Sequence, residues 1–401
     1  MPEAVIVATG RTPIGRAIKG SLKDCRPDDL AAFIIKEVLA KLPQLDPQTV
    51  EDVILGCGQP GGEAGYNVAR VAAILAGLPD VPGVTVNRYC SSSLQSIRMA
   101  AHAIRAGEGD VFVAAGVEAV SSYRNGAADT GPHNPLFADG EARTVARSTA
   151  AGEPWTPQPG FPDVYIAMGQ TAENVAEFKQ VSREAQDEFA LESQRRAVAA
   201  QESGFFDREI IPVTTPDGTV VSKDDGPRAG TTLEGLAGLQ PVFREGGTIT
   251  AGNACPLNDG AAAVIVMSDI RARELGITPL ARVVASGVTG LNPEIMGLGP
   301  VEAIRQTLAR AKMTIDDIDL VEINEAFAAQ VVPSADELGI GRDKLNVRGG
   351  AIALGHPFGQ TGARIMTTLL NALEDTDKTF GLESMCVGGG QGMAMIVERL
   401  S

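Results

Sequence analysis

The stretch VNRYCSSSLQSIRMAAHAIRAG, residues 86–107, places Cys90 where an expected strand gives way to an expected helix. A thiol at a helix N-terminus feels the partial positive charge of unpaired backbone N–H groups, which favours the thiolate. We therefore expect a lowered pKa for Cys90 and a role as a nucleophile. The alternative is a buried packing cysteine, and an isolated cysteine fits that description more often than a catalytic one.

His356 shifts this balance, because a histidine that can accept a thiol proton is the usual partner of a cysteine nucleophile. It lies in GGAIALGHPFGQTGAR, where glycines allow close backbone approach and Pro357 precedes an expected helix. The two other histidines have no comparable surroundings: His102 lies in an alanine-rich helix, and His133 in a Pro/Gly-rich segment where we expect it to be solvated. The alternative for His356 is a structural histidine that caps a helix.

Cys386 in SMCVGGGQGMAM and Asn324 in EINEAF complete the set of candidate residues. The three glycines after Cys386 leave successive backbone N–H groups free to donate, as an oxyanion hole requires. A second thiol at this position can act as an acid or a base. A core cysteine before a Gly-rich turn is the alternative, and asparagine is common in turns, so neither residue is decisive alone.

These candidates lie at the junctions of alternating strands and helices, a pattern that predicts a sheet covered by helices. In the first part of the chain we expect strands at 3–10, 50–57, 83–87 and 110–116, and helices at 28–42, 67–78 and 93–107. From 121 to 250 the sequence is rich in Gly, Pro and polar residues, and we interpret it as an inserted lid that contains a helical hairpin. The alternating pattern then resumes.

The two ends of the chain repeat one order of elements. A strand GVTVN, a cysteine, an amphipathic helix and a strand DVFVAAG are matched by a strand LNV, a histidine, an amphipathic helix and a strand FGLESMCV. We predict two duplicated βαβ-rich halves, and if their equivalent helices pack side by side, the N-terminal ends meet. The expected domains are 1–120 with 251–272, an inserted domain 121–250, and 273–401.

Length, charge and composition argue against several classes of protein. A chain of 401 residues is too long for one ordinary core, and a net charge of −16 with one Trp and four Tyr argues against a nucleic-acid partner. We find no signal peptide and no run approaching ~18 apolar residues, so we expect a cytoplasmic protein without a membrane span. Five scattered cysteines without a CxxC pair predict neither a disulfide framework nor a metal site.

Four stretches, in this order, resemble the thiolase family of acetyl-CoA acyltransferases: NRYCSSSLQS, NEAF, GGAIALGHPFGQTGAR and CVGGGQGMAM. The segments TAGNACPLNDGAAAV, SRE…DEFALESQRRA and MGLGPVEA also resemble thiolases, so the resemblance covers essentially the whole chain. One nucleophile block with one histidine block and one second-cysteine block distinguishes thiolases from the related ketoacyl synthases. The resemblance implies the α/β thiolase fold, with two duplicated halves in an α/β/α/β/α layered arrangement and an inserted lid domain.

The resemblance also implies a 3-ketoacyl-CoA thiolase. Cys90 would attack the 3-keto thioester after His356 removes its proton, and Cys386 would protonate the departing acetyl-CoA enolate and later deprotonate coenzyme A. The backbone N–H groups of Cys90 and Gly388 would form one oxyanion hole, and His356 with a water held by Asn324 the other. Coenzyme A would be a substrate, with no metal and no tightly bound cofactor.

The expected coenzyme A contacts are carried over from the family one position at a time. Arg228, in DDGPRAGTTLEGLAGL, matches an arginine at the nucleotide end. Cys255 and Pro256 replace the usual serine and glycine after TAGNA, beside the expected pantetheine tunnel. Plain core packing is the alternative for the two matching methionines. The full set of expected contacts is Met168, Arg228, Cys255, Met296 and Phe327.

The acyl chain and the direction of the reaction stay open. Ala167 stands where acetoacetyl-specific thiolases carry a histidine, which favours a broader thiolase of fatty acid β-oxidation. The alternatives are an acetoacetyl-CoA thiolase that works in the condensation direction and a non-catalytic, thiolase-like lipid-binding protein. Cys–His hydrolysis is disfavoured because it gives Cys386 no role. The family resemblance predicts a homodimer or a homotetramer.

Overall fold

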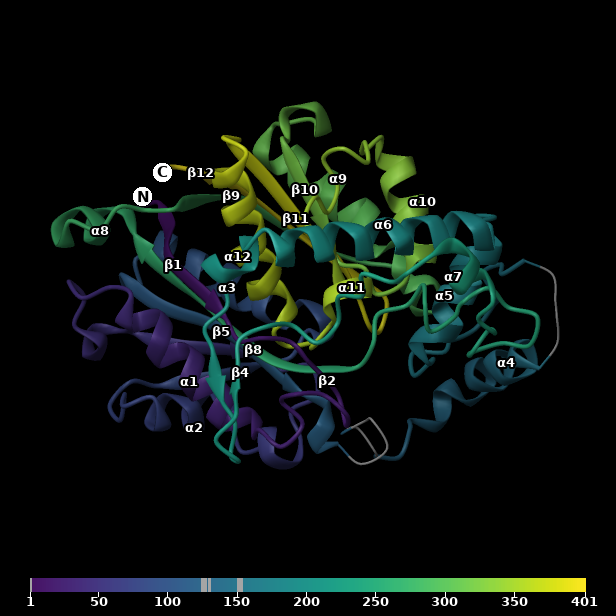
Figure 1. The fold of residues 1–401 in the computed structure, drawn as a ribbon, viewed down its shortest axis with the longest axis horizontal. Coiled ribbons are helices and arrows are strands. Elements are labelled where there is room, and N and C mark those ends of the chain that lie inside the picture. Colours follow the sequence, from purple (N-terminus) through teal and green to yellow (C-terminus); the bar gives the residue numbers. More distant parts are fainter. Residues whose placement is uncertain (1, 124–127, 129–130, 150–153) are drawn as a thin grey trace.

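The computed structural model describes residues 2–123, 128, 131–149 and 154–401. Its centre is a ten-stranded mixed sheet with the order β10-β11-β12-β9-β1-β8-β5-β3-β4, in which the short β2 pairs with β8 (Figure 1). The strands are β1 (Ala4–Arg11), β2 (Gly15–Arg16), β3 (Asp52–Gly56), β4 (Gly83–Val86), β5 (Val111–Ala119), β8 (Asn258–Ser268), β9 (Ala281–Gly290), β10 (Leu320–Ile323), β11 (Phe380–Val387) and β12 (Gln391–Arg399). A separate hairpin pairs β6 (Val213–Thr214) with β7 (Val220–Val221).

The helices follow the predicted alternation. They are α1 (Pro27–Ala40), α2 (Val68–Leu75), α3 (Ser92–Ala106), α4 (Ala138–Ser148), α5 (Met168–Phe178), α6 (Arg183–Glu202), α7 (Leu233–Ala237), α8 (Asp269–Leu275), α9 (Gly299–Ala311), α10 (Ala328–Leu338), α11 (Ala351–Leu354) and α12 (Thr361–Asp375). None of the helices in the described part of the chain combines the length and apolarity that crossing a membrane requires.

The large sheet is built from two halves with the same strand pairings. In the first half, β8 runs antiparallel to both β1 and β5, and β3 runs parallel to β5. In the second half, β12 runs antiparallel to both β9 and β11, and β10 runs parallel to β11. The halves join where β1 pairs with β9 at Val5–Arg282 and Ile6–Ala281. The predicted duplication is confirmed, whereas the three domain boundaries given above stay a prediction.

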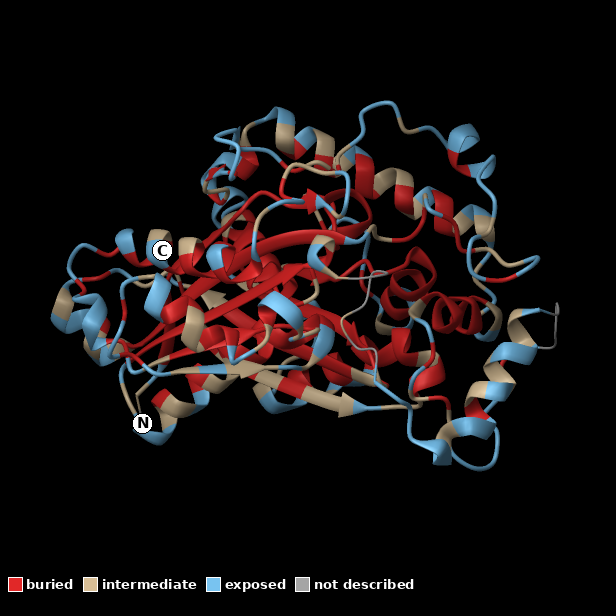
Figure 2. Cartoon of the chain, turned by 90° about the horizontal axis from the view of Figure 1, so that it is seen from below, coloured by how far each residue is buried: buried red, intermediate tan, exposed pale blue. Residues whose placement is uncertain are grey.

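The strands β1, β5, β8, β10 and β11 are buried on both faces, which explains why they read as continuous apolar runs, whereas the edge strand β4 is partly exposed (Figure 2). In β8, Val264 and Val266 face α3 and α12, whereas Ile265 and Met267 face α1 and α2 on the other side. In the second half, α9 and α10 cover the outer face of β10, β11 and β12. The layers are therefore α1/α2, the first half-sheet, α3/α12, the second half-sheet and α9/α10.

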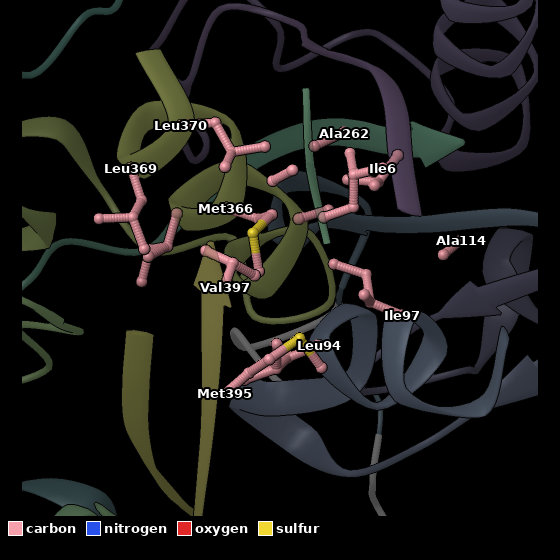
Figure 3. Packing of buried hydrophobic residues seen from close by; sticks show 14 of the residues in the cluster. Ile6, Leu94, Ile97, Ala114, Ala262, Met366, Leu369, Leu370, Met395 and Val397 are labelled. Atoms are coloured by element: carbon pink, nitrogen blue, oxygen red, sulfur yellow. The ribbon is translucent and has the colours of Figure 1, made fainter. Parts of the chain in front are cut away.

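Helices α3 and α12 form the central layer, where they pack against each other. Figure 3 shows Leu94 and Ile97 of α3 in one apolar core with Met366 and Leu369 of α12. At Gly362, a Cβ would lie 2.4 Å from the backbone nitrogen of Leu94, so the two helices approach closely only because this residue is a glycine. Both contact residues lie in the first turn of their helix, and the N-terminal ends therefore lie side by side.

The inserted segment 121–250 contributes the helices α4 to α7, which Figure 1 places on one side of the central sheet. Its predicted helical hairpin corresponds to α5 and α6, and Ser182 caps α6 by accepting the N–H of Ala185 at 3.1 Å. The predicted lid also includes 124–127, 129–130 and 150–153, which lie outside the described residues. Helices α5 and α6 both pack on α10, so the segment is anchored to the second half.

Candidate active site

Cys90 lies in the tight turn Tyr89–Ser91, between the edge strand β4 and helix α3. Tyr89 has a φ of +41°, a left-handed conformation that is costly for a bulky residue and often occurs at functional sites. The turn leaves the Cys90 side chain 8% exposed. The backbone N–H groups of Gly388 and of Cys90 itself form hydrogen bonds to the Cys90 thiol.

The pKa of Cys90 differs from the prediction. Burial raises it to about 12, although the hydrogen bonds from the two backbone N–H groups act in the opposite direction. The expected lowering was wrong. Burial removes the thiolate from water, and this costs more free energy than the interaction with the helix N-terminus recovers. The negative charge of Glu118 raises the pKa further. The resting Cys90 side chain is therefore a thiol, and a role as a nucleophile would require a base.

The segments that carry Cys90 and His356 adjoin. A Cβ on Gly58 would lie 2.9 Å from the Cβ of Phe358 and 3.5 Å from the carbonyl oxygen of Tyr89, so the residues after His356 and before Cys90 flank the same glycine. The turn that holds Cys90 also contacts α12 and β11. Contacts across the two halves of the fold thus bring the first cysteine block, the histidine block and the second cysteine block into one region.

The tautomer of His356 follows from its neighbours. His356 is 1% exposed, and its Nδ1 lies 2.7 Å from Thr361 Oγ1. Thr361 donates its only hydroxyl hydrogen to the carbonyl oxygen of Pro357, at 2.8 Å. Its oxygen is therefore left to accept, so Nδ1 of His356 carries the hydrogen and Nε2 is unprotonated.

Asn324 faces this unprotonated nitrogen. Its Nδ2 lies 3.3 Å from Nε2 of His356 and donates to it, while its backbone N–H donates to the carbonyl oxygen of Ser384 at 2.9 Å. Its Oδ1 is buried and has no hydrogen-bond partner in the described part of the chain. Burial, with a smaller effect of the Arg364 guanidinium, lowers the pKa of His356 to about 3. The imidazole is therefore neutral and can accept a proton at Nε2.

Cys386 lies near the end of β11 and is 1% exposed. Its thiol donates to Oε1 of Gln330, with 3.5 Å between sulfur and oxygen. Burial raises its pKa well above the ordinary value, and interactions with Cys90 and then Cys255 add to this effect. Three thiols thus lie close enough to influence one another's ionisation.

Most of the residues expected to contact coenzyme A lie in one apolar cluster with Cys386. Cys255 is held at its edge by a hydrogen bond from its backbone N–H to the carbonyl oxygen of Ala326, at 3.0 Å. The expected contact residues in this cluster are Met168, Cys255, Met296 and Phe327.

Arg228 is not in that cluster. It lines a cavity of about 440 Å³, together with Arg16, Gly235 and Pro256. Burial and the charge of Arg16 lower the pKa of Arg228, since two guanidinium groups here share one partly enclosed space. Such a pair suits a polyanionic ligand. Pro256 adjoins Cys255 in the chain and so links this cavity to the apolar cluster.

A second cavity, of about 350 Å³, opens beside Cys90. His133 is one of its lining residues, and its side chain is half exposed, which confirms the expectation of a solvated loop histidine. Its ring stacks on Tyr165 with 3.9 Å between centroids, and Nδ1 lies 2.9 Å from a carboxylate oxygen of Glu141. The other lining residues include Gln59, Tyr89, Cys90, Val164, Ile166, Ala167, Met168, Phe358, Gly388 and Gly389.

Sequence reasoning missed three polar residues of this region: Thr361, Gln330 and Arg16. For Thr361 a signal exists, because a hydroxyl five residues after His356, at the start of a helix, can return to the imidazole. Gln330 and Arg16 reach the site only through tertiary packing, so nothing in their local sequence points to them.

Comparison with known proteins identifies the family. The model of the thiolase N-terminal domain matches residues 4–270, and the model of the thiolase C-terminal domain matches residues 277–399. The chain belongs to the thiolase family. This thiolase is 44% identical to a beta-ketoadipyl-CoA thiolase of Acinetobacter baylyi and 44% identical to a 3-ketoacyl-CoA thiolase of Aeromonas hydrophila, with 100% of both chains covered in each comparison. The crystal structure of the Bacillus anthracis acetyl-CoA acetyltransferase is similar, with a TM-score of 0.86 and 42% identity over 100% of this thiolase and 99% of that chain.

Proposed function

We propose that this thiolase cleaves 3-ketoacyl-CoA with coenzyme A, giving acetyl-CoA and a shortened acyl-CoA through an acyl-enzyme on Cys90. The observation that carries the proposal is the unprotonated Nε2 of His356, produced by the hydrogen bonds of Thr361 and faced by Asn324. A pure binding protein does not need this arrangement, which provides a proton acceptor in the region that holds two buried thiols.

In the first half of the reaction, Nε2 of His356 takes the proton of Cys90, and the sulfur attacks the 3-keto carbon. The bond between the second and third carbons then breaks, and its electrons stay with the acetyl-CoA enolate. Cys386 protonates the enolate carbon, which gives acetyl-CoA and leaves the acyl group on Cys90. Positioned acid–base groups of this kind contribute about 10²–10⁴-fold to a rate.

In the second half, the Cys386 thiolate takes the proton of coenzyme A, and the coenzyme A sulfur attacks the thioester on Cys90. Collapse of the tetrahedral intermediate expels the Cys90 sulfur, and the His356 imidazolium returns its proton. The N–H groups of Cys90 and Gly388, which already bond to the thiol, form one oxyanion hole. His356 forms the other with a water that the unpartnered Oδ1 of Asn324 helps to hold.

Coenzyme A lies, in this proposal, between the two cavities. Arg16 and Arg228 bind the phosphates of its nucleotide end, and the pantetheine arm passes Pro256 and Cys255 to reach Cys386. A cysteine replaces a hydroxyl in the tunnel, and a thiol is a weaker hydrogen-bond donor. The acyl chain occupies the cavity beside Cys90, and no tightly bound cofactor takes part.

We infer a substrate longer than acetoacetyl-CoA, because Ala167 leaves room in the wall of the acyl cavity. An acetoacetyl-CoA thiolase that works in the condensation direction is the second candidate, supported by the similarity to the Bacillus anthracis acetyl-CoA acetyltransferase. A series of 3-ketoacyl-CoA substrates of increasing length, assayed for thiolysis, separates them. A clear preference for longer chains supports the first candidate, and activity confined to acetoacetyl-CoA supports the second.

We also propose a homo-oligomer, a dimer or a tetramer. Strand β4 ends the large sheet, Val84 on it is 36% exposed, and the nearby Tyr66 is 97% exposed. An unpaired edge strand with exposed apolar side chains is suited to pairing with a second copy. Light scattering measures the mass directly. The requirement for free thiols at Cys90 and Cys386 supports a reducing cytoplasmic location.

A further inference from the structure

Gln330 is the polar side chain in contact with the acid–base cysteine. It lies in the first turn of α10, is 2% exposed, and places Oε1 3.5 Å from Cys386 Sγ. On the other side of the carboxamide, Nε2 lies 3.5 Å from Thr171 Oγ1 and 3.6 Å from Met296 Sδ. The amide thus lies between the thiol of Cys386 on one side and the Thr171 hydroxyl and Met296 thioether on the other.

The orientation of this amide follows from the capacities of its neighbours. Thr171 donates its hydroxyl hydrogen to the carbonyl oxygen of Met168 at 2.6 Å, so its oxygen can only accept from Gln330. The thioether of Met296 has no hydrogen to donate. A flipped amide would place its oxygen against two groups that cannot donate. Oε1 of Gln330 therefore faces Cys386, where it can only accept the S–H hydrogen.

The space around Gln330 leaves its side chain little freedom. A Cβ on Gly297 would lie 2.2 Å from Cγ and 2.4 Å from Nε2 of Gln330. Gly297 belongs to the short helical segment Pro293–Leu298 directly before α9, and the absence of a side chain there makes room for the amide. A methyl group at this position would push the amide away from the thiol without removing it.

We propose that Gln330 is the positioning residue of Cys386: its carboxamide oxygen accepts the resting S–H and holds this cysteine in its acid form. The proposal rests on the function proposed above. When the S–H bond breaks and the proton moves to the enolate carbon, the electron pair stays on sulfur, facing the partly negative oxygen of Gln330. This repulsion favours recapture of a proton from the thiol of coenzyme A, which leaves coenzyme A as the attacking thiolate.

The first test titrates Cys386 without any thiolysis assay. Iodoacetamide alkylation of the full-length protein is followed by mass spectrometry of the Cys386 peptide at several pH values, for wild type and Gln330→Met. Met has a similar shape and no carbonyl, so the thiolate is no longer opposed. We expect a pKa lower by about half a unit and hence roughly threefold faster alkylation at a given pH. An unchanged rate overturns the proposal.

The second test measures the pH profile of thiolysis with acetoacetyl-CoA and coenzyme A as probes. Gln330→Met and Gly297→Ala should lower kcat by about threefold to tenfold and move the basic limb of the profile to lower pH, with both KM values little changed. The control is Gln186→Met, a buried glutamine of α6 that bonds to Val181 and Thr248 instead of a thiol. Its profile should match that of wild type.

The two tests separate the inference from the proposed function. If wild type shows no thiolysis but Gln330→Met still accelerates alkylation of Cys386, the function fails and the control of the thiol by Gln330 stands. If wild type cleaves acetoacetyl-CoA and neither variant moves the pH profile or the alkylation rate, the inference fails. Equal shifts in Gln186→Met would also overturn it, because they would reflect general loosening of the fold.

Discussion

Replacement of Thr361 by valine tests the orientation of His356 with a nearly isosteric change. Thr361 Oγ1 accepts Nδ1–H at 2.7 Å and donates to the carbonyl oxygen of Pro357 at 2.8 Å, and a valine methyl group can do neither. His356 is 1% exposed, so no bulk water replaces the lost acceptor. An unsatisfied buried donor costs about 1–3 kcal/mol.

The imidazole can escape this cost by moving its proton to Nε2, the atom that must accept the proton of Cys90. Because about 1.4 kcal/mol corresponds to a tenfold change in population, the competent tautomer should fall by roughly 10- to 100-fold. We expect kcat for thiolysis to fall by the same factor. Both KM values should stay nearly constant, since Thr361 lines neither of the two cavities described above.

The assay follows the loss of the 3-keto thioester of acetoacetyl-CoA at saturating coenzyme A, with thermal unfolding measured in parallel. Thr361→Ser keeps the hydroxyl and should retain most of the activity, which makes it the matched control. The reasoning would be refuted if the valine variant stayed within about twofold of wild type, or if the serine variant were equally slow.

Three further predictions follow from the site. The pKa of His356 is about 3 in the folded state against 6.5 for the free side chain, so the unfolded chain takes up the proton first and the free energy of unfolding should fall as the pH drops below 6.5. In His356→Gln, the free energy of unfolding by denaturant should depend less on pH in this range. Identical pH dependence in the variant and wild type would contradict the assignment. Asn324→Ala should lower kcat by about 10²-fold with little change in KM. An unchanged kcat would show that Asn324 does not contribute to an oxyanion hole. Arg228→Ala should raise KM for coenzyme A by roughly tenfold while kcat holds, whereas an unaltered KM would exclude this cavity as the nucleotide site.

Much of the fold can be predicted because several central strands, such as β5 and β8, are buried on both faces and many of its helices are amphipathic. The runs around Val264 and the helix that follows Cys90 therefore carry clear signals. The repeat of these signals in the second half predicts the duplication, and the small residue at Gly362 permits the contact that brings the two helix ends together. Local pattern and global fold agree in these segments.

The remaining features depend on burial and on contacts between distant residues. The pKa of Cys90 is shifted upward, opposite to the predicted direction. The effect of burying the thiol is larger than the opposing effect of the helix N-terminus. His133 is solvated as predicted, but its stacking on Tyr165 is a contact between distant residues that the local sequence does not indicate. The approach of Gln330 to Cys386 is likewise a product of tertiary packing, so neither local sequence indicates it.

The most direct test of the central claim is the identity of the residue that carries the acyl group. The protein is mixed with acetoacetyl-CoA without free coenzyme A, quenched in acid, digested and examined by peptide mass spectrometry. We predict one acetyl group on the peptide that contains Cys90, and none on the peptides with Cys255 or Cys386. An acetyl group on either of those cysteines, or turnover with an unmodified Cys90 peptide at every time point, would contradict the account.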